Sequence, residues 1–223
     1  MKIRLALLML VLCSCPAAAQ DMPLSQIIKE GEGWRLAATI ANPLHLSRIG
    51  GYMVRTRSGY VYSTHQGHKV VFVTSPDGQR SKVELPVAEP TGLILTPEDE
   101  RLVVADAAGK SLWSFRVENN GTLTGGEPYY ALFLRRGETR SEARMLDFDT
   151  AGRLYVATKE GVQILDPTGR LCGVLVNPSN EPIDQMRFGN PNWQQLLIRC
   201  GASWYSRPLL AKGPVETETS KKP

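Results

Sequence analysis

The sequence predicts an all-β fold made of about four repeated four-stranded units. Short runs of β-branched and aromatic residues end repeatedly in Gly, Pro, Asn or Asp, which is typical of strands joined by tight turns. Four of these runs are hexapeptides of one kind, YVYSTH, RLVVAD, RLYVAT and QLLIRC, which begin at positions 60, 101, 153 and 195. No window after residue 45 keeps a helical period.

Each hexapeptide occupies the same place in a longer unit. An inner-strand candidate precedes it (GGYMVRT, PTGLILT, RMLDFDT or IDQMRFG), and another strand follows it (KVVFVT, SLWSFRV, GVQIL or SWYSRPL). In the first three units a turn through SPDG, ENNG or DPTG leads to a fourth strand (SKVELPV, EPYYALFL or RLCGVLV). Four strands at a period near 40 residues predict the blades of a β-propeller, in which each small sheet buries its faces against its neighbours.

The main alternative is a β-sandwich, in which strands also recur about every 8 to 12 residues. The regular recurrence of the four-strand unit favours the propeller. The longest interval between hexapeptides includes residues 116–140, where we expect a widened outer hairpin and an exposed basic loop.

Residues 1–19 have the three zones of a secretory signal peptide. Lys2 and Arg4 supply the positive start, residues 5–12 the apolar stretch, and AAA at 17–19 a cleavage site. We therefore expect an exported protein, periplasmic or secreted. The alternative is a lipoprotein acylated at Cys15, because the run LCSC places a small residue before that cysteine.

The rest of the chain divides into three parts. Residues 20–45 form an N-terminal segment with one helical turn and one closing strand, which we place at residues 34–40 because the last unit has no outer strand of its own and its edge needs cover. Residues 46–211 form the propeller domain. Residues 212–223, KGPVETETSKKP, are too polar to bury a core and are expected to be disordered.

Composition excludes two classes of partner. Removing Lys2 and Arg4 with the signal lowers the 26 basic residues to 24, against 22 acidic ones. The resulting net charge of +2 does not indicate a nucleic-acid-binding surface. No apolar run approaches the roughly 18 residues of a transmembrane helix. Cys172 and Cys200 both lie in apolar strand-like runs, so buried thiols are favoured over a disulfide.

Three segments carry a family resemblance: PTGLILTPEDERLVVADAAGKSLWSFRVENNGTL, AGRLYVATKEGVQILDPTGRL and FGNPNWQQLLIRCGASWYSR. In their order, turns and spacing they resemble the gluconolactonase, regucalcin and senescence-marker-protein family over residues 50–210. The resemblance implies a calcium-dependent β-propeller lactonase, usually with six blades and one divalent cation at the mouth of the central channel. Such a cation needs several converging oxygens, and it would polarise the lactone carbonyl and activate water.

The resemblance also identifies the metal-ligand positions, and three of them have changed. Thr91 stands where the family has the Asn of Pro-Asn-Gly, Arg144 where it has the Asp of Asp-Gly-Met, and Gly51 where it has the Asn of Asn-Asp. The family's first glutamate has no counterpart here. We therefore expect no cofactor, with calcium or another divalent cation as the alternative.

Arg144 places a permanent positive charge where the family has a carboxylate. Asp184 stands at the equivalent place in the last unit and is the internal candidate to pair with Arg144 across the mouth, while a ligand carboxylate is the external one; a surface arginine is the alternative reading. Arg144, Asp184, Thr91 and Tyr52 are the ligand-binding candidates. Asp147 and Asp149 are the fallback metal ligands, although turn capping explains such carboxylates equally well.

Three functions remain open. The first is a non-catalytic relative that binds a small anionic or sugar-like ligand, or a protein, on the face that carries Arg144. The second is a metal-dependent lactone hydrolase that uses Asp147, Asp149 and Asp184. The third is a structural remnant that completes its ring by oligomerisation or with another chain. The turn with His65 and His68 indicates a solvated corner, because no Cys or carboxylate flanks it at ligand spacing.

Overall fold

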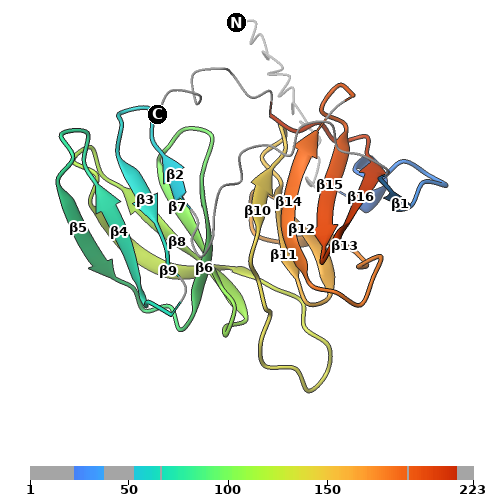
Figure 1. The fold of residues 1–223 in the computed structure, drawn as a ribbon, viewed down its shortest axis with the longest axis horizontal. Helices are drawn as coiled ribbons and strands as arrows, with labels where there is room; N and C mark the ends of the chain where they lie inside the picture. The colour runs from blue at the N-terminus through green and yellow to red at the C-terminus, as the bar shows by residue number, and fades with distance from the viewer. Residues whose placement is uncertain (1–22, 38–52, 66, 190, 215–223) are drawn as a thin grey trace, which may run out of the picture.

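The structure is a computed structural model that describes residues 23–37, 53–65, 67–189 and 191–214 (Figure 1). In these residues the only helical element is the 3-10 helix η1 (Leu24–Gln26), and the remaining elements are strands. The predicted signal peptide, Gly51 and Tyr52 lie outside the described residues.

Sixteen strands form four antiparallel four-stranded sheets, which confirms the predicted all-β, four-bladed architecture. The first blade contains β2 (Met53–Arg55), β3 (Val61–Ser63), β4 (Val70–Thr74) and β5 (Arg80–Glu84). The second contains β6 (Pro90–Leu95), β7 (Arg101–Asp106), β8 (Ser111–Val117) and β9 (Leu123–Ala131). The third contains β10 (Leu146–Phe148), β11 (Leu154–Thr158), β12 (Gly161–Leu165) and β13 (Leu171–Leu175). The fourth contains β14 (Ile183–Gly189), β15 (Gln195–Cys200), β16 (Ser203–Pro208) and β1 (Arg35–Leu36).

The outer strand of the fourth blade comes from the N-terminal segment. Arg35 pairs with Ser206 and Leu36 with Tyr205, so β1 covers the edge of β16. This is the closing strand that the missing fourth strand of the last unit predicted. Residues 38–40 of that prediction lie outside the described residues.

The hydrophobic core is divided into three clusters, one between each pair of successive blades. Tyr62 and Leu102 lie in the cluster between the first and second blades, and Val103 and Val156 in the next. The third cluster joins the third and fourth blades. Among the described residues no hydrophobic cluster joins the fourth blade to the first, so the four blades form an arc in chain order (Figure 1).

The bounds of one predicted strand, the one that leads into the long connection between the second and third blades, were wrong. The sequence places a strand over residues 127–134, whereas β9 begins at Leu123 and ends at Ala131. At its end, β9 gives way to a loop before Phe133, whose backbone N–H and carbonyl both bind the amide of the fully buried Gln163, each at 2.8 Å. This pairing replaces a strand partner and anchors the loop that leads to β10.

The packed chain extends slightly beyond the predicted domain boundary at residue 211. The backbone N–H of Thr150 donates to the carbonyl of Lys212, and that of Gly213 to the carbonyl of Trp193, each at 2.8 Å. Residues 212–214 therefore cross the third and fourth blades. Residues 215–223 lie outside the described part.

Candidate functional site

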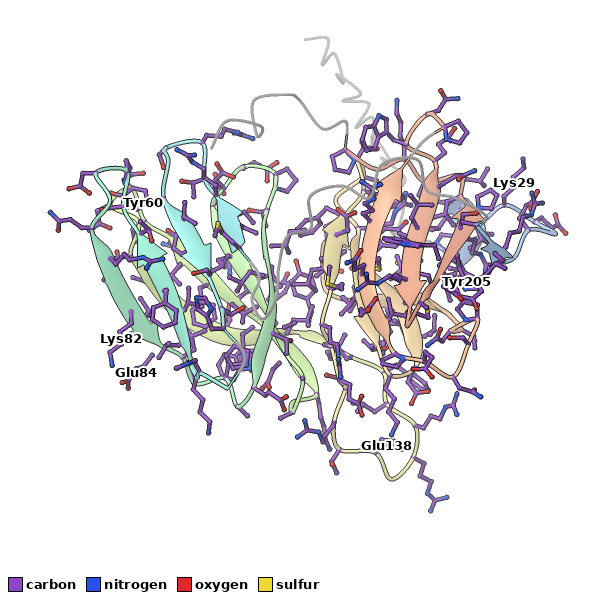
Figure 2. All side chains as sticks on the ribbon, in the orientation of Figure 1. Lys29, Tyr60, Lys82, Glu84, Glu138 and Tyr205 are labelled. Atoms are coloured by element: carbon purple, nitrogen blue, oxygen red, sulfur yellow. The ribbon has the colours of Figure 1, made fainter. Side chains whose placement is uncertain are left out.

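The predicted site lies at the mouth, which we define as the edge of the blades where the inner strands β6, β10 and β14 begin. Thr91 belongs to β6, Arg144 precedes β10, and Asp184 belongs to β14. On the same edge, the loop between β9 and β10 extends away from the blades and carries Glu138 (Figure 2). Lys159 pairs with Glu138 at 3.0 Å, so the loop is tied to the third blade.

The hydroxyl group of Thr91 is used inside the fold. Its Oγ1 donates to the carbonyl of Ala143 at 2.6 Å, in the segment leading to the third blade. The carbonyl of Thr91 accepts from Thr64 Oγ1 at 2.8 Å, from the first blade. Thr91 therefore connects three successive blades at the mouth rather than presenting an oxygen to a ligand.

Gly92 allows β6 to approach the segment before β10 closely. A Cβ atom added at Gly92 would lie 1.9 Å from the carbonyl oxygen of Arg144. That overlap is impossible, so only glycine fits this contact. Gly92 thus has a structural role, because it positions the backbone of Arg144.

The side chain of Arg144 is only weakly paired. Its nearest carboxylate among the described residues is that of Glu142, with Nη2 to Oε2 at 3.9 Å. The side chain of Arg144 is 42% exposed. The backbone N–H of Arg144 donates to the carbonyl of Ala157 at 3.0 Å, which fixes the start of the side chain. Arg144 therefore presents an accessible guanidinium at the mouth.

Of the two candidate partners of Arg144, the internal one is excluded, because Arg144 and Asp184 do not pair. Asp184 instead binds Arg199 of its own blade, with Nε to Oδ1 at 2.9 Å and Nη2 to Oδ2 at 2.7 Å. The hydrogen bonds to Asp184 raise the pKa of Arg199 further above its usual range. The physical reason is a register shift between Ile183 and Gln185, which places Asp184 beside Arg199 on the neighbouring strand.

Asp147 and Asp149 both hold the fold together. The carboxylate of Asp147 accepts from the backbone N–H of Phe188 at 2.9 Å, and so joins the third blade to the fourth. Asp149 is buried, with 2% of its surface exposed, and pairs with Arg153. It also accepts from Tyr155 Oη at 3.1 Å, and burial raises the pKa of Tyr155 well above its usual range. Asp149 Oδ1 also accepts from the backbone N–H groups of Ala151 and Arg153, at 2.9 and 3.0 Å, so the turn-capping explanation fits Asp149.

These residues do not fit the calcium site that the family resemblance implies. Calcium binds about six to eight oxygen atoms, which must converge on the ion from separate elements of the fold. The hydroxyl of Thr91 donates a hydrogen bond to a carbonyl, Arg144 is cationic, and Asp184 forms an ion pair with Arg199. In the described part of the chain no three His, Cys, Asp or Glu residues come together as a possible metal site. Tyr52 and Gly51 lie outside that part.

Cys172 and Cys200 are free thiols, as the apolar context of both residues favours. Cys200 is buried and Cys172 is partly buried. Burial raises the pKa of both thiols, which keeps them protonated and unreactive at neutral pH. His65 and His68 lie edge-on to the ring of Phe72, with centroids 5.1 and 6.0 Å away, which agrees with a corner and not a metal site.

A concave region lies between the second and third blades, at the opposite edge from the mouth. This cleft has a volume of about 410 Å³ and is bordered by the turns after β6, β10 and β12. Its aromatic lining comes from Tyr129, Tyr130 and Phe148. Its acidic side chains are those of Glu98 and Glu100. The sequence analysis missed the cleft. Its only signal in the sequence is the pair of proline-led turns TPEDE and DPTG.

Comparison with known proteins agrees with this architecture. No protein-family model matches the chain. A curated gluconolactonase of Zymomonas mobilis is 28% identical over 133 residues, which cover 57% of this chain and 37% of that protein. The solved calcium-binding protein regucalcin of Agrobacterium tumefaciens matches with a TM-score of 0.59 and 15% identity over 74% of this chain and 62% of its own.

The chain is similar in sequence to a gluconolactonase and has the β-propeller fold of gluconolactonases and regucalcin. A gluconolactonase of Xanthomonas campestris has the same fold, with a TM-score of 0.57 and 19% identity over 70% of this chain and 56% of its own. This gluconolactonase-like chain spans little more than a third of the length of the curated relative it matches. No helix in its described residues is long and apolar enough to cross a membrane.

Proposed function

We propose that this gluconolactonase-like protein is an exported, non-catalytic binding protein that takes a small anionic, sugar-like ligand at the mouth of its blades. The observation that supports the proposal is the accessible guanidinium of Arg144, whose nearest described carboxylate, that of Glu142, is 3.9 Å away. Asp184, the other candidate partner, is occupied by Arg199.

A sugar acid suits this arrangement. A planar guanidinium binds a carboxylate through two parallel N–H donors, which gives orientation as well as energy. Thr91 and Thr64 fix the backbone at the mouth, and Gly92 holds the strand beside Arg144, so the guanidinium projects from a rigid base. A rigid base lowers the entropic cost of binding.

The engaged carboxylates argue against catalysis. A metal-activated water needs ligands with free oxygens, whereas Asp147, Asp149 and Asp184 each accept hydrogen bonds from within the fold. Using them for a cation would leave Arg153 or Arg199 without its carboxylate. The replaced ligand positions therefore favour binding over lactone hydrolysis.

Calorimetric titration of the full chain with gluconate and related sugar acids tests the proposal. Arg144→Ala should weaken binding by about 1.5 to 3 kcal/mol, the range for hydrogen bonds to charged groups. Arg136→Ala is the matched control, because Arg136 is an exposed arginine on the neighbouring loop. If the wild type binds none of the acids, or both variants lose affinity equally, Arg144 is not the contact.

A metal-dependent lactone hydrolase is the second candidate, and the curated gluconolactonase relative favours it. A lactone assay with calcium, zinc or manganese distinguishes the two. Turnover near the typical enzyme value of roughly 10 per second would contradict the non-catalytic proposal. Asp147, Asp149 and Asp184 would then be the first residues to substitute.

Completion of the ring by oligomerisation is the third candidate. Its support is the arrangement of the described blades, in which the first and the fourth each have a single neighbouring blade. Sedimentation equilibrium measures the mass in solution directly. A monomer would leave the binding proposal standing and remove this alternative.

A further inference from the structure

We propose that the cleft between the second and third blades binds a small organic cation, that is, an ammonium or guanidinium group on an apolar stem. The cleft lies where β6 and β10 end, whereas Thr91 and Arg144 lie where these strands begin. It is therefore a separate site from the mouth, and the two can be tested independently.

The cleft offers an accessible aromatic ring over an apolar floor. Tyr129 is 43% exposed, and its ring meets that of Tyr130 edge-on with centroids 4.8 Å apart. Phe148 is buried beneath, with 6% exposed. Gly169 has a positive φ of 85°, and a Cβ atom there would be 3.5 Å from the Tyr129 ring, so this turn fits closely beside the ring.

The charge of the cleft is negative. Glu98 and Glu100 line it and are exposed, and neither forms an ion pair within the described chain. Arg101, the cation in the lining, is already held: it donates to Ser114 Oγ at 2.8 Å and lies 3.6 Å from Glu127. Neither carboxylate therefore has an ion-pair partner among the described residues.

The turn that carries these carboxylates is held in place by the first blade. The carboxylate of Asp99, which has a positive φ of 62°, accepts from the backbone N–H of Arg57 at 2.7 Å. The guanidinium of Arg57 also donates to the carbonyl of Pro97. Both contacts hold the backbone of the turn from which Glu98 and Glu100 extend, and a backbone that is already ordered reduces the entropy lost on binding.

These features together select the ligand. A cation is attracted to the face of an aromatic ring and to carboxylates, and the apolar floor accepts the stem that carries the charge. An anion would meet Glu98 and Glu100 and be repelled. A neutral sugar could stack on Tyr129 but would leave the two negative charges uncompensated.

NMR titration of the full chain with N-acetyl-arginine methylamide tests the site, with the citrulline analogue as the neutral probe of the same shape. We expect the arginine probe to bind with a dissociation constant on the order of 1 mM and the citrulline probe at least about tenfold more weakly. Equal binding of both probes, or no binding of either, would overturn the proposal.

Variants then assign the contacts. The double variant Glu98→Gln/Glu100→Gln should weaken binding about tenfold, and Tyr129→Leu about threefold, while Tyr129→Phe keeps the ring and the affinity. Glu84→Gln is the matched control, because Glu84 is an exposed carboxylate on the outer strand of the first blade (Figure 2). If Glu84→Gln has the same effect as the double variant, only the overall charge attracts the probe and the site does not exist. Arg144→Ala should leave this binding unchanged.

Discussion

At the residue scale, Asp149 shows how a carboxylate at the end of an inner strand is used in this fold. Its oxygens accept from the Arg153 guanidinium, from Tyr155 Oη and from the backbone N–H of Ala151 at 2.9 Å. Asp166 repeats the same D-x-x-G-R turn with Arg170, whose side chain is 58% exposed. The two turns share a sequence pattern and differ in the burial of the arginine.

This difference predicts unequal costs. Asp149→Ala leaves Arg153, whose side chain is 9% exposed, as an unpaired buried charge, and should lower the free energy of unfolding by about 3 to 5 kcal/mol. Asp166→Ala removes the carboxylate partner of Arg170, but the side chain of Arg170 is already 58% exposed to water, so the variant should cost only about 1 to 2 kcal/mol. Urea denaturation measures both. A stable Asp149→Ala variant would return Asp149 to the list of candidate metal ligands.

At the element scale, the contact between β6 and the segment before β10 determines the geometry of the mouth. Gly92 lets the Arg144 carbonyl approach, while Thr91 bonds the carbonyl of Ala143 one residue earlier. Two successive residues of β6 therefore hold two successive residues before β10. The position of the Arg144 side chain depends on this pairing.

Gly92→Ala should disrupt the pairing. The added methyl group would overlap a backbone oxygen at 1.9 Å, so the two segments must separate, at a cost of about 2 kcal/mol or more. Gly33→Ala is the control, because nothing lies within 4 Å of a Cβ atom at Gly33. Thermal unfolding of both variants checks the prediction. An unchanged melting temperature for Gly92→Ala would show that this contact is looser than the structure has it.

At the scale of the whole molecule, the sequence repeat predicted the blades because every blade is a four-stranded sheet that buries its apolar side chains against a neighbouring blade. The site was harder to predict. The register shift at Ile183 that brings Asp184 to Arg199 leaves no mark in the hexapeptide pattern, so the sequence left open whether Asp184 pairs with Arg144, and the structure shows that it does not. The cleft was missed for a related reason: Glu98, Tyr129 and Pro167 meet only once blades are packed side by side.

The N-terminal segment is what completes the arc at its last interface. Ile27 is fully buried among residues of the third and fourth blades, although it precedes both by more than a hundred positions in the chain. The Trp34 indole N–H donates to the carbonyl of Val176 at 2.8 Å, and Leu24 packs over Gly173. The segment therefore packs against both β13 and β16, and so does more than add one edge strand.

Ile27→Ala should consequently destabilise the whole molecule. Removing a fully buried isoleucine side chain leaves a cavity at the interface between the third and fourth blades, at a cost of about 2 to 5 kcal/mol. Leu36→Ala, in β1 of the same segment but 69% exposed, should change the free energy of unfolding by no more than about 0.5 kcal/mol. Urea denaturation followed by tryptophan fluorescence measures both. Equal small effects would mean that the third and fourth blades hold together without the segment, and that β1 only covers an edge.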